Sequence, residues 1–302
     1  MNYKNLFLAI VFLSSIVVSA QSNLLNAKTP DQIGKKSEAQ LNSDNDKPLP
    51  YGYIDDRDVL FGKTVWEIID LDERVNFPLY YPIDENLGSD RRSLYSVLVE
   101  AIRSGELTEV YSSSYFNEKK TLKEIEASLV KKDTTDSGRE EMNTDYEAYM
   151  SGSKVVSQEY INITELKAID VDGYRVVGRW YFDKRQGELK YRMLGICPVI
   201  PDVYTMGQEE KDYIDLFWVF FPSARDILHD NYAFNDKNSS APISFDHLLN
   251  ARRFNAVIYQ EENISGDRKI EEYMKENAQM QLLESERIKD KIRNFEQDMW
   301  SY

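Results

Sequence analysis

An alternation of apolar and polar side chains in the middle of the chain constrains its fold more than any other feature. Over residues 174–183 every second residue is apolar or small, and the same period of two resumes over 189–197. This period places successive side chains on opposite faces of a strand, so that one face can be buried. The polar loop between the two runs contains Gly187, which accepts the positive φ of a tight turn. The sequence therefore predicts an antiparallel β-hairpin.

A third run, 213–221, is almost entirely apolar, aromatic or β-branched. This composition favours a strand covered on both faces over a helix, and we expect it to be the central strand of the sheet. The predicted sheet also contains the two hairpin strands, near 172–183 and 188–197, and a fourth strand over 253–260. The fold class that follows is α+β, a mixed or antiparallel sheet with flanking helices and a long C-terminal helix.

Several helices are predicted from apolar spacing and capping residues. An apolar stripe over 93–103 ends before Gly105, which is typical of a helix and its C-terminal cap. Thr64, with Glu67 three residues later, fits a helix N-terminus, so a short helix is expected to bear Val65, Trp66 and Ile69. The remaining elements expected are an extended 76–82, a short strand over 106–111, a helix over 121–130, a strand or short helix and strand over 155–171, and helical turns over 223–229 and 244–249.

The first 20 residues have the pattern of a secretory signal peptide, with one base, an apolar run from 6 to 18 and small residues before a cleavage site. We expect cleavage between Ala20 and Gln21. The apolar run is shorter than the roughly 20 residues that cross a bilayer. A lipoprotein would need a cysteine in place of Gln21. The sequence thus predicts an exported chain with no direct membrane insertion, attached to a membrane only through a partner.

The mature chain divides into three predicted parts. Residues 21–54 are polar and form a flexible N-terminal arm, which is either a tether or a segment that orders on a partner through Leu24, Leu25 and the stretch 48–51. Residues 55–266 form the main α+β domain, with a polar insertion at 131–154 read as a surface loop. Residues 267–302 form a C-terminal helical extension.

The C-terminal helix has a divided apolar stripe. Its second half places Ile288, Ile292, Phe295 and Met299 on one face, while polar residues interrupt the stripe between the two halves. One half could pack on the protein's own sheet and the other on a neighbouring molecule. The alternative is a helix kinked over a single core. These four residues are therefore candidate partner contacts.

Charge and residue usage exclude several function classes. Removing Lys4 with the signal peptide changes the 37 bases and 52 acids to 36 and 52, a net charge of −16. Such a surface repels nucleic acid and anionic headgroups. The single cysteine, Cys197, rules out an intramolecular disulfide and is expected in the core. Neither His229 nor His247 lies in a catalytic or metal-binding motif. We predict no enzyme, no catalytic residue, no cofactor and no metal site.

Arg252 and Arg253 are the remaining candidate binding residues. They could clamp a carboxylate of a partner, or form ion pairs within the chain, which is the commoner role of such a pair.

The stretches that carry a family resemblance are 65–73, 79–82, 94–98, 180–183, 192–198, 217–225, 246–254 and 298–300. On these the chain resembles the GldN/PorN family, periplasmic components of the type IX secretion and gliding motility machinery of Bacteroidetes. The resemblance extends over about 55–302.

The resemblance implies a structural role. Family members form a periplasmic ring together with a GldK/PorK-like outer-membrane lipoprotein, and they contact a GldM/PorM-like motor subunit. The resemblance therefore implies that this chain binds copies of itself and these two partners. The implied location is the periplasm, at the inner face of the outer membrane. An alternative function is a periplasmic small-ligand or carbohydrate-binding protein that uses Trp66, Trp180 and Trp218 on an aromatic sheet face.

Overall fold

The computed structural model describes residues 29, 47–84, 87, 92–144, 146–151, 157–206, 208, 211–234, 243–275 and 277–300. The strands are β1 Val59–Asp70, β2 Val110–Tyr111, β3 Val130–Thr134, β4 Ile161–Glu165, β5 Gly173–Asp183, β6 Glu188–Pro201, β7 Tyr213–Asp215, β8 Trp218–Phe220, β9 Tyr232–Ala233, β10 Ile243–Ser244 and β11 Val257–Glu261. The α-helices are α3 Phe77–Tyr80, α4 Leu94–Ser104, α5 Leu122–Leu129, α6 Asp136–Thr144, α7 Tyr146–Met150, α8 Phe221–Asp230, α9 Phe245–Asn250, α10 Ile270–Tyr273 and α11 Ala278–Trp300.

The main sheet is antiparallel, with the strand order β11-β1-β5-β6-β8-β2 and β7 on the same edge of β6 as β8. β5 pairs along its length with β1 on one side and β6 on the other. The predicted hairpin is β5–β6, and Gly187 in its turn has φ +67°. Helices and an antiparallel sheet in one chain confirm the predicted α+β class.

The strand predicted over 213–221 is wrong in both length and position. It splits into β7 and β8, which pair with β6 near an edge of the sheet. The two residues between them, Leu216 and Phe217, are fully buried, so core packing explains their apolar character without strand pairing. β8 ends at Phe220 because Pro222 lies in the first turn of α8, where its missing N–H costs nothing.

The short helix predicted from Thr64 is also wrong, because this region lies within β1. Three consecutive residues, 65–67, are buried in this strand. Val65 packs against Ile288 of α11 on one face, and Trp66 packs in a cluster with Trp218 on the other. Both faces are therefore covered, which removes the alternation that marks a half-buried strand. Thr64 and Glu67 have the spacing of a helix capping box by chance, because both residues lie in a strand.

Residues 76–82 were expected to be extended but contain the helical turn α3. Pro78 lies in its first turn, a position that tolerates proline. The buried Asn76 holds this turn on the sheet by donating to the carbonyls of Asp70 and Asn255 at 2.6 and 3.0 Å.

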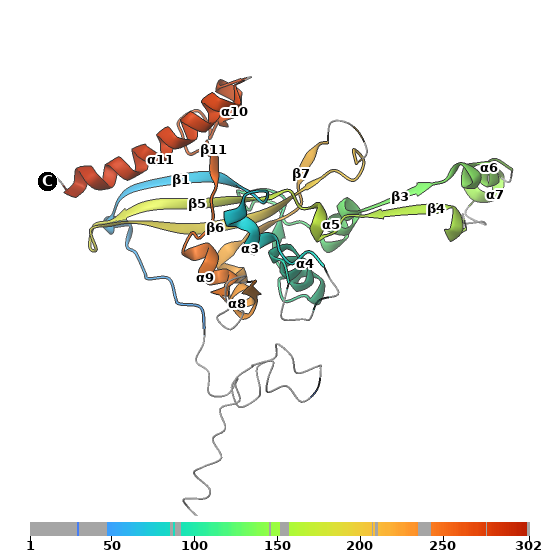
Figure 1. Ribbon diagram of the computed structural model, residues 1–302, viewed down its shortest axis with the longest axis horizontal. Coiled ribbons are helices and arrows are strands. Elements are labelled where there is room, and N and C mark those ends of the chain that lie inside the picture. The colour runs from blue at the N-terminus through green and yellow to red at the C-terminus, as the bar shows by residue number, and fades with distance from the viewer. Residues whose placement is uncertain are drawn as a thin grey trace, which may run out of the picture.

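The predicted helix over 93–103 is confirmed as α4. The Ser93 side chain accepts from the Ser96 amide, and Gly105 ends the helix with φ +79°. α4 packs with α5, α8 and α9 against one side of the sheet and forms the main core (Figure 1). Ser244 caps α9 as expected.

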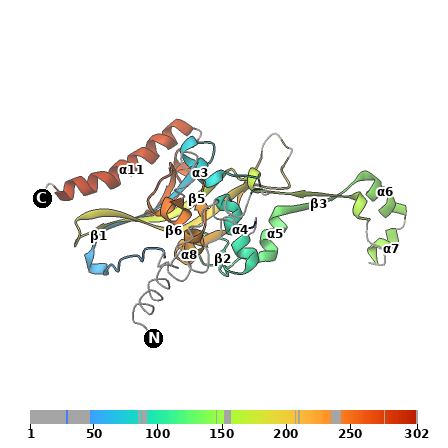
Figure 2. The ribbon, with the colours of Figure 1, turned by 60° about the horizontal axis from the view of Figure 1, so that its bottom comes forward.

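The described residues of the 131–154 insertion, 131–144 and 146–151, are not a loop. β3 pairs with β4 in a two-stranded ribbon that carries α6 and α7 and extends away from the main sheet (Figures 1 and 2). Backbone pairing forms this ribbon, and its polar residues, such as Lys131 and Lys132, give little apolar alternation to reveal it.

The predicted C-terminal helix is divided into α10 and α11. The side chain of Asn277 accepts from the Met280 amide at 3.1 Å and so starts a new helix, while Gln281 donates to the Met274 carbonyl at 2.9 Å. In Figure 1, α11 runs along the end of the main sheet at which the β5–β6 turn lies.

Candidate interaction surface

The inner face of α11 packs on the protein's own sheet. Ile288 and Ile292 are 1% and 4% exposed and belong to a cluster with Val65 and Ile258. The Phe295 ring stacks on Phe61, with 4.4 Å between ring centroids. Met299 is half-buried. Of the two arrangements left open by the sequence, the structure therefore favours a kinked helix over a single core.

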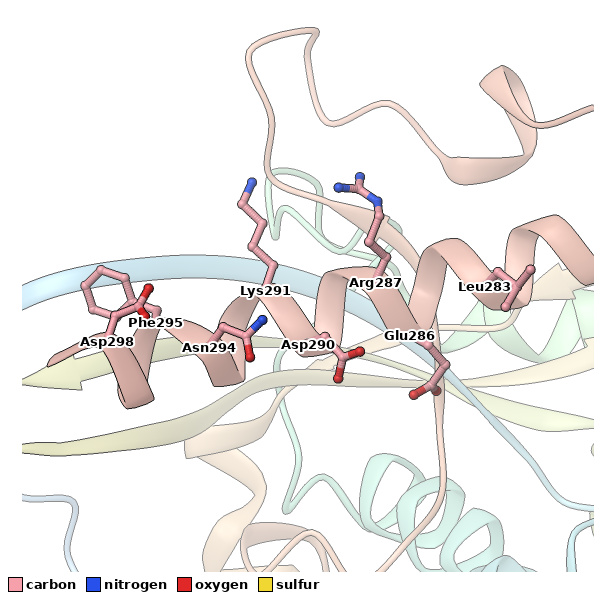
Figure 3. Close-up of a pocket in the computed structure, with 8 residues that line it drawn as sticks. All are labelled: Leu283, Glu286, Arg287, Asp290, Lys291, Asn294, Phe295 and Asp298. Atoms are coloured by element: carbon pink, nitrogen blue, oxygen red, sulfur yellow. The ribbon is translucent and has the colours of Figure 1, made fainter. Parts of the chain in front are cut away.

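The outer face of α11 has a shallow hollow of about 590 Å³ (Figure 3). Arg287 and Lys291 project to one side of the helix axis and Glu286 and Asp290 to the other. Glu286 pairs with Lys289 at 2.9 Å and Asp290 with Arg293 at 3.1 Å. Such i,i+3 pairs are typical of a solvated helix face and give no specific ligand site.

Apolar side chains stand at the N-terminal end of that outer face. Met280, Leu282 and Leu283 are 45%, 51% and 63% exposed. Single exposed leucines need no explanation, but three apolar residues within four positions form a candidate contact surface. Leu282 and Leu283 lie to the side of the apolar stripe, so helical spacing did not mark them as contacts.

Arg252 is held inside the molecule. Its Nη1 and Nη2 atoms donate to the two carboxylate oxygens of Glu67 at 2.8 and 2.9 Å. Its guanidinium carbon lies 4.1 Å from the Tyr191 ring centroid and 5.1 Å from that of Trp180. Burial raises the pKa of Tyr191, which stays a neutral phenol beside the carboxylate. This placement favours the internal ion pair over a partner clamp, while Arg253 is exposed.

The end of the predicted flexible arm is attached to the body by Tyr51. Its hydroxyl donates to Asn250 Oδ1 at 2.7 Å, and its ring centroid lies 4.2 Å from the Arg225 guanidinium carbon and 4.6 Å from that of Arg192. Burial raises the pKa of Tyr51. A cavity of about 700 Å³ lies among this segment, β6, α8 and α9, and both histidines line it. The stretch 48–51 was a candidate anchor for a partner, whereas its Tyr51 contacts the protein's own body.

Leu24, Leu25 and the cleavage site at Ala20 and Gln21 lie outside the described residues.

Cys197, Trp66 and Trp218 are in the core, whereas Trp180 is half-buried. Cys197 is fully buried, and burial raises its thiol pKa well above the ordinary value. Trp66 and Trp218 are 3% and 2% exposed in the same cluster, so they do not form an open aromatic platform. Among the described residues, no three or more His, Cys, Asp or Glu side chains gather as a metal site would require.

Where the structure describes the chain, none of its helices has both the length and the apolar character needed to cross a membrane.

A family model described as the gliding motility associated protein GldN matches residues 54–301. The chain belongs to the GldN family. The match covers most of the chain, including the sheet, the ribbon and α11, and it confirms the resemblance seen in the sequence. No curated protein matches the chain. Membership makes it a gliding motility associated protein.

Proposed function

We propose that this chain is a non-enzymatic structural subunit of the type IX secretion and gliding motility machinery. In this role it forms a periplasmic ring with copies of itself and with a GldK/PorK-like outer-membrane lipoprotein, and it contacts a GldM/PorM-like motor subunit. It is held at the inner face of the outer membrane by the lipoprotein. The family match over 54–301 is the observation that carries this proposal.

The shape of the molecule supports an assembly role. The β3–β4 ribbon extends from one end, and α11 lies near the other (Figure 1). Projecting elements of this kind suit the head-to-tail contacts from which rings are built. The exposed Leu282 and Leu283 on α11 add a candidate partner contact.

No specific observation favours the small-ligand alternative. Its platform required Trp66 and Trp218 at a surface, whereas both are buried beside Cys197.

The test is gentle detergent extraction of the native envelope, affinity isolation of the tagged chain, mass spectrometry and size estimation. We expect a high-mass assembly that contains a lipoprotein and a motor subunit. Recovery as a lone monomer would overturn the proposed function.

Two variants sharpen this test. Leu282→Ser with Leu283→Ser removes the exposed apolar pair, and Arg293→Ser changes a charged residue on the same helix as a matched control. If the leucines contact a partner, only the first variant loses part of the assembly.

A further inference from the structure

Where the structure describes the end of the β3–β4 ribbon, few of its side chains are buried. Gly138 is the only buried residue of α6, and on α7 Tyr146 and Met150 are 58% and 71% exposed. On the ribbon itself Ile163 is 63% exposed. A two-stranded ribbon without a covering layer is marginally stable in water. This end, which we call the tip and define as residues 133–144 and 146–150, therefore has the character of a surface that another molecule covers.

The tip is strongly acidic. Residues 133–144 and 146–150 contain five acids and one base, so their net charge is −4. Asp136 and Glu140 are exposed on α6, and Glu147 is exposed on α7. A partner that covers the tip should therefore present positive charge together with apolar contacts.

The opposite end of the same molecule has that combination. The β5–β6 turn lies at the far end of the long axis from α6 and α7 (Figure 1). Residues 179–192 contain five bases and two acids, a net charge of +3 in a chain whose total is −15. Lys184 is exposed, and the Arg185 side chain is 63% exposed while it pairs with Asp58 at 3.4 Å.

Apolar side chains accompany these bases. Leu60, near the start of β1, is 46% exposed. The Lys184 amide donates to the Asp58 carbonyl at 2.8 Å, which holds the start of β1 beside the turn. We call this end, residues 57–60 and 179–192, the turn end.

We propose that the tip of one copy of this chain binds the turn end of a second copy. Each copy carries both complementary surfaces at opposite ends, so the contact repeats head to tail instead of closing a two-fold dimer. The inference rests on the proposed function and adds to it the two surfaces through which neighbouring copies meet.

Cross-linking of the full mature chain tests this contact. Asn143→Cys places an exposed thiol on α6, and Gln186→Cys places one in the turn. The native Cys197 is fully buried and gives little background. With a bis-maleimide, the double variant should form a ladder of covalent oligomers. Each single variant should form none, because one thiol per chain permits a dimer at most.

Charge reversal supplies the second test. Lys184→Glu with Arg185→Glu should lower the ladder yield about tenfold, because like charges would then face each other. Adding Glu140→Lys with Glu147→Lys should restore much of it. The matched control is Lys123→Glu with Lys275→Glu, which makes the same charge change at exposed sites elsewhere and should leave the yield unchanged.

The outcomes separate the inference from the proposed function. A ladder in both the purified chain and the native envelope supports the inference. Recovery of the native high-mass assembly without any ladder overturns the inference and leaves the proposed function intact. A ladder without a native assembly supports the contact and overturns the function. Cross-links that join two turn ends or two tips would also overturn the head-to-tail arrangement.

Discussion

Arg252 and Glu67 form a bidentate ion pair between residues 185 positions apart in the sequence. Glu67 lies in β1 and is 1% exposed, and Arg252 follows α9 with the left-handed φ of +51°. Tyr191 and Trp180 cover the guanidinium. The pair therefore fixes the α9–β11 connection on the sheet.

Replacing Arg252 should destabilise the fold. Arg252→Ala leaves the Glu67 carboxylate buried without its partner, and we expect a loss of about 3 kcal/mol in the free energy of unfolding, measured in urea. Arg253→Ala, at the exposed neighbour, should change it by less than about 0.5 kcal/mol. Equal losses in the two variants would show that the pair does not stabilise the fold. The double variant Glu67→Gln with Arg252→Met should recover part of the loss.

Phe295 should contribute to docking of α11 on its own sheet. Its ring contacts Phe61 and Phe182, so Phe295→Ala should cost about 2 kcal/mol and raise amide hydrogen exchange along α11. Leu283→Ala, on the outer face of the same helix, should leave exchange unchanged. Normal exchange in Phe295→Ala would instead assign Phe295 to a partner, as the sequence first indicated.

Glu284 should make stability depend on pH in the acid range. The hydrogen bond from Arg287 lowers the pKa of the Glu284 carboxyl. A lowered folded-state pKa contributes stability that is present above the unfolded value, about 4.3, and is lost as pH falls through the folded value. Glu284→Gln should therefore melt below the parent at pH 7 and approach it in acid. If the difference in melting temperature between Glu284→Gln and the parent is the same at pH 7 and in acid, this assignment is contradicted.

Tyr51 should control access to the segment before β1. Tyr51→Ala removes the ring from Arg192 and Arg225 and the bond to Asn250, so a protease should cut at Lys47 or Arg57 several-fold faster than in the parent. Tyr53→Ala is the matched control, since Tyr53 is 83% exposed. If both variants are cut at the parent rate, the segment is held by other contacts.

Cys197 should resist thiol reagents until the chain unfolds. The thiol is fully buried and its pKa is raised by burial, so both access and the thiolate fraction are low. A chromogenic disulfide should label it only in denaturant. Rapid labelling of the native protein would show that the sheet opens around Cys197.

The elements predicted best have local signals. Ser93 and Gly105 cap the two ends of α4, and Thr121 and Glu124 form a capping box at the start of α5, so residues close in sequence mark these ends. The β5–β6 hairpin was equally accessible, since its alternation and its turn are adjacent in sequence.

The errors arose where distant segments decide the structure. β1 lost its alternation because side chains from distant elements cover both of its faces, as the clusters around Val65 and Trp66 show. Residues 216–217 are apolar because of core packing. The Glu67–Arg252 pair could not be read from either residue's neighbours. The tip and the turn end were missed for the same reason. Their opposite charges suggest a contact only once the fold places them at opposite ends of the molecule.

The position of β1 also has a consequence for folding. β1 is the first strand in the sequence, yet its partners are β5 and β11, which begin at residues 173 and 257. Contacts of such sequence separation form slowly, because a long loop must close before any pairing offsets its entropy. The first strand to be synthesised thus keeps one edge unpaired until almost the whole chain is available. Truncations before residue 257 should therefore yield an aggregation-prone chain.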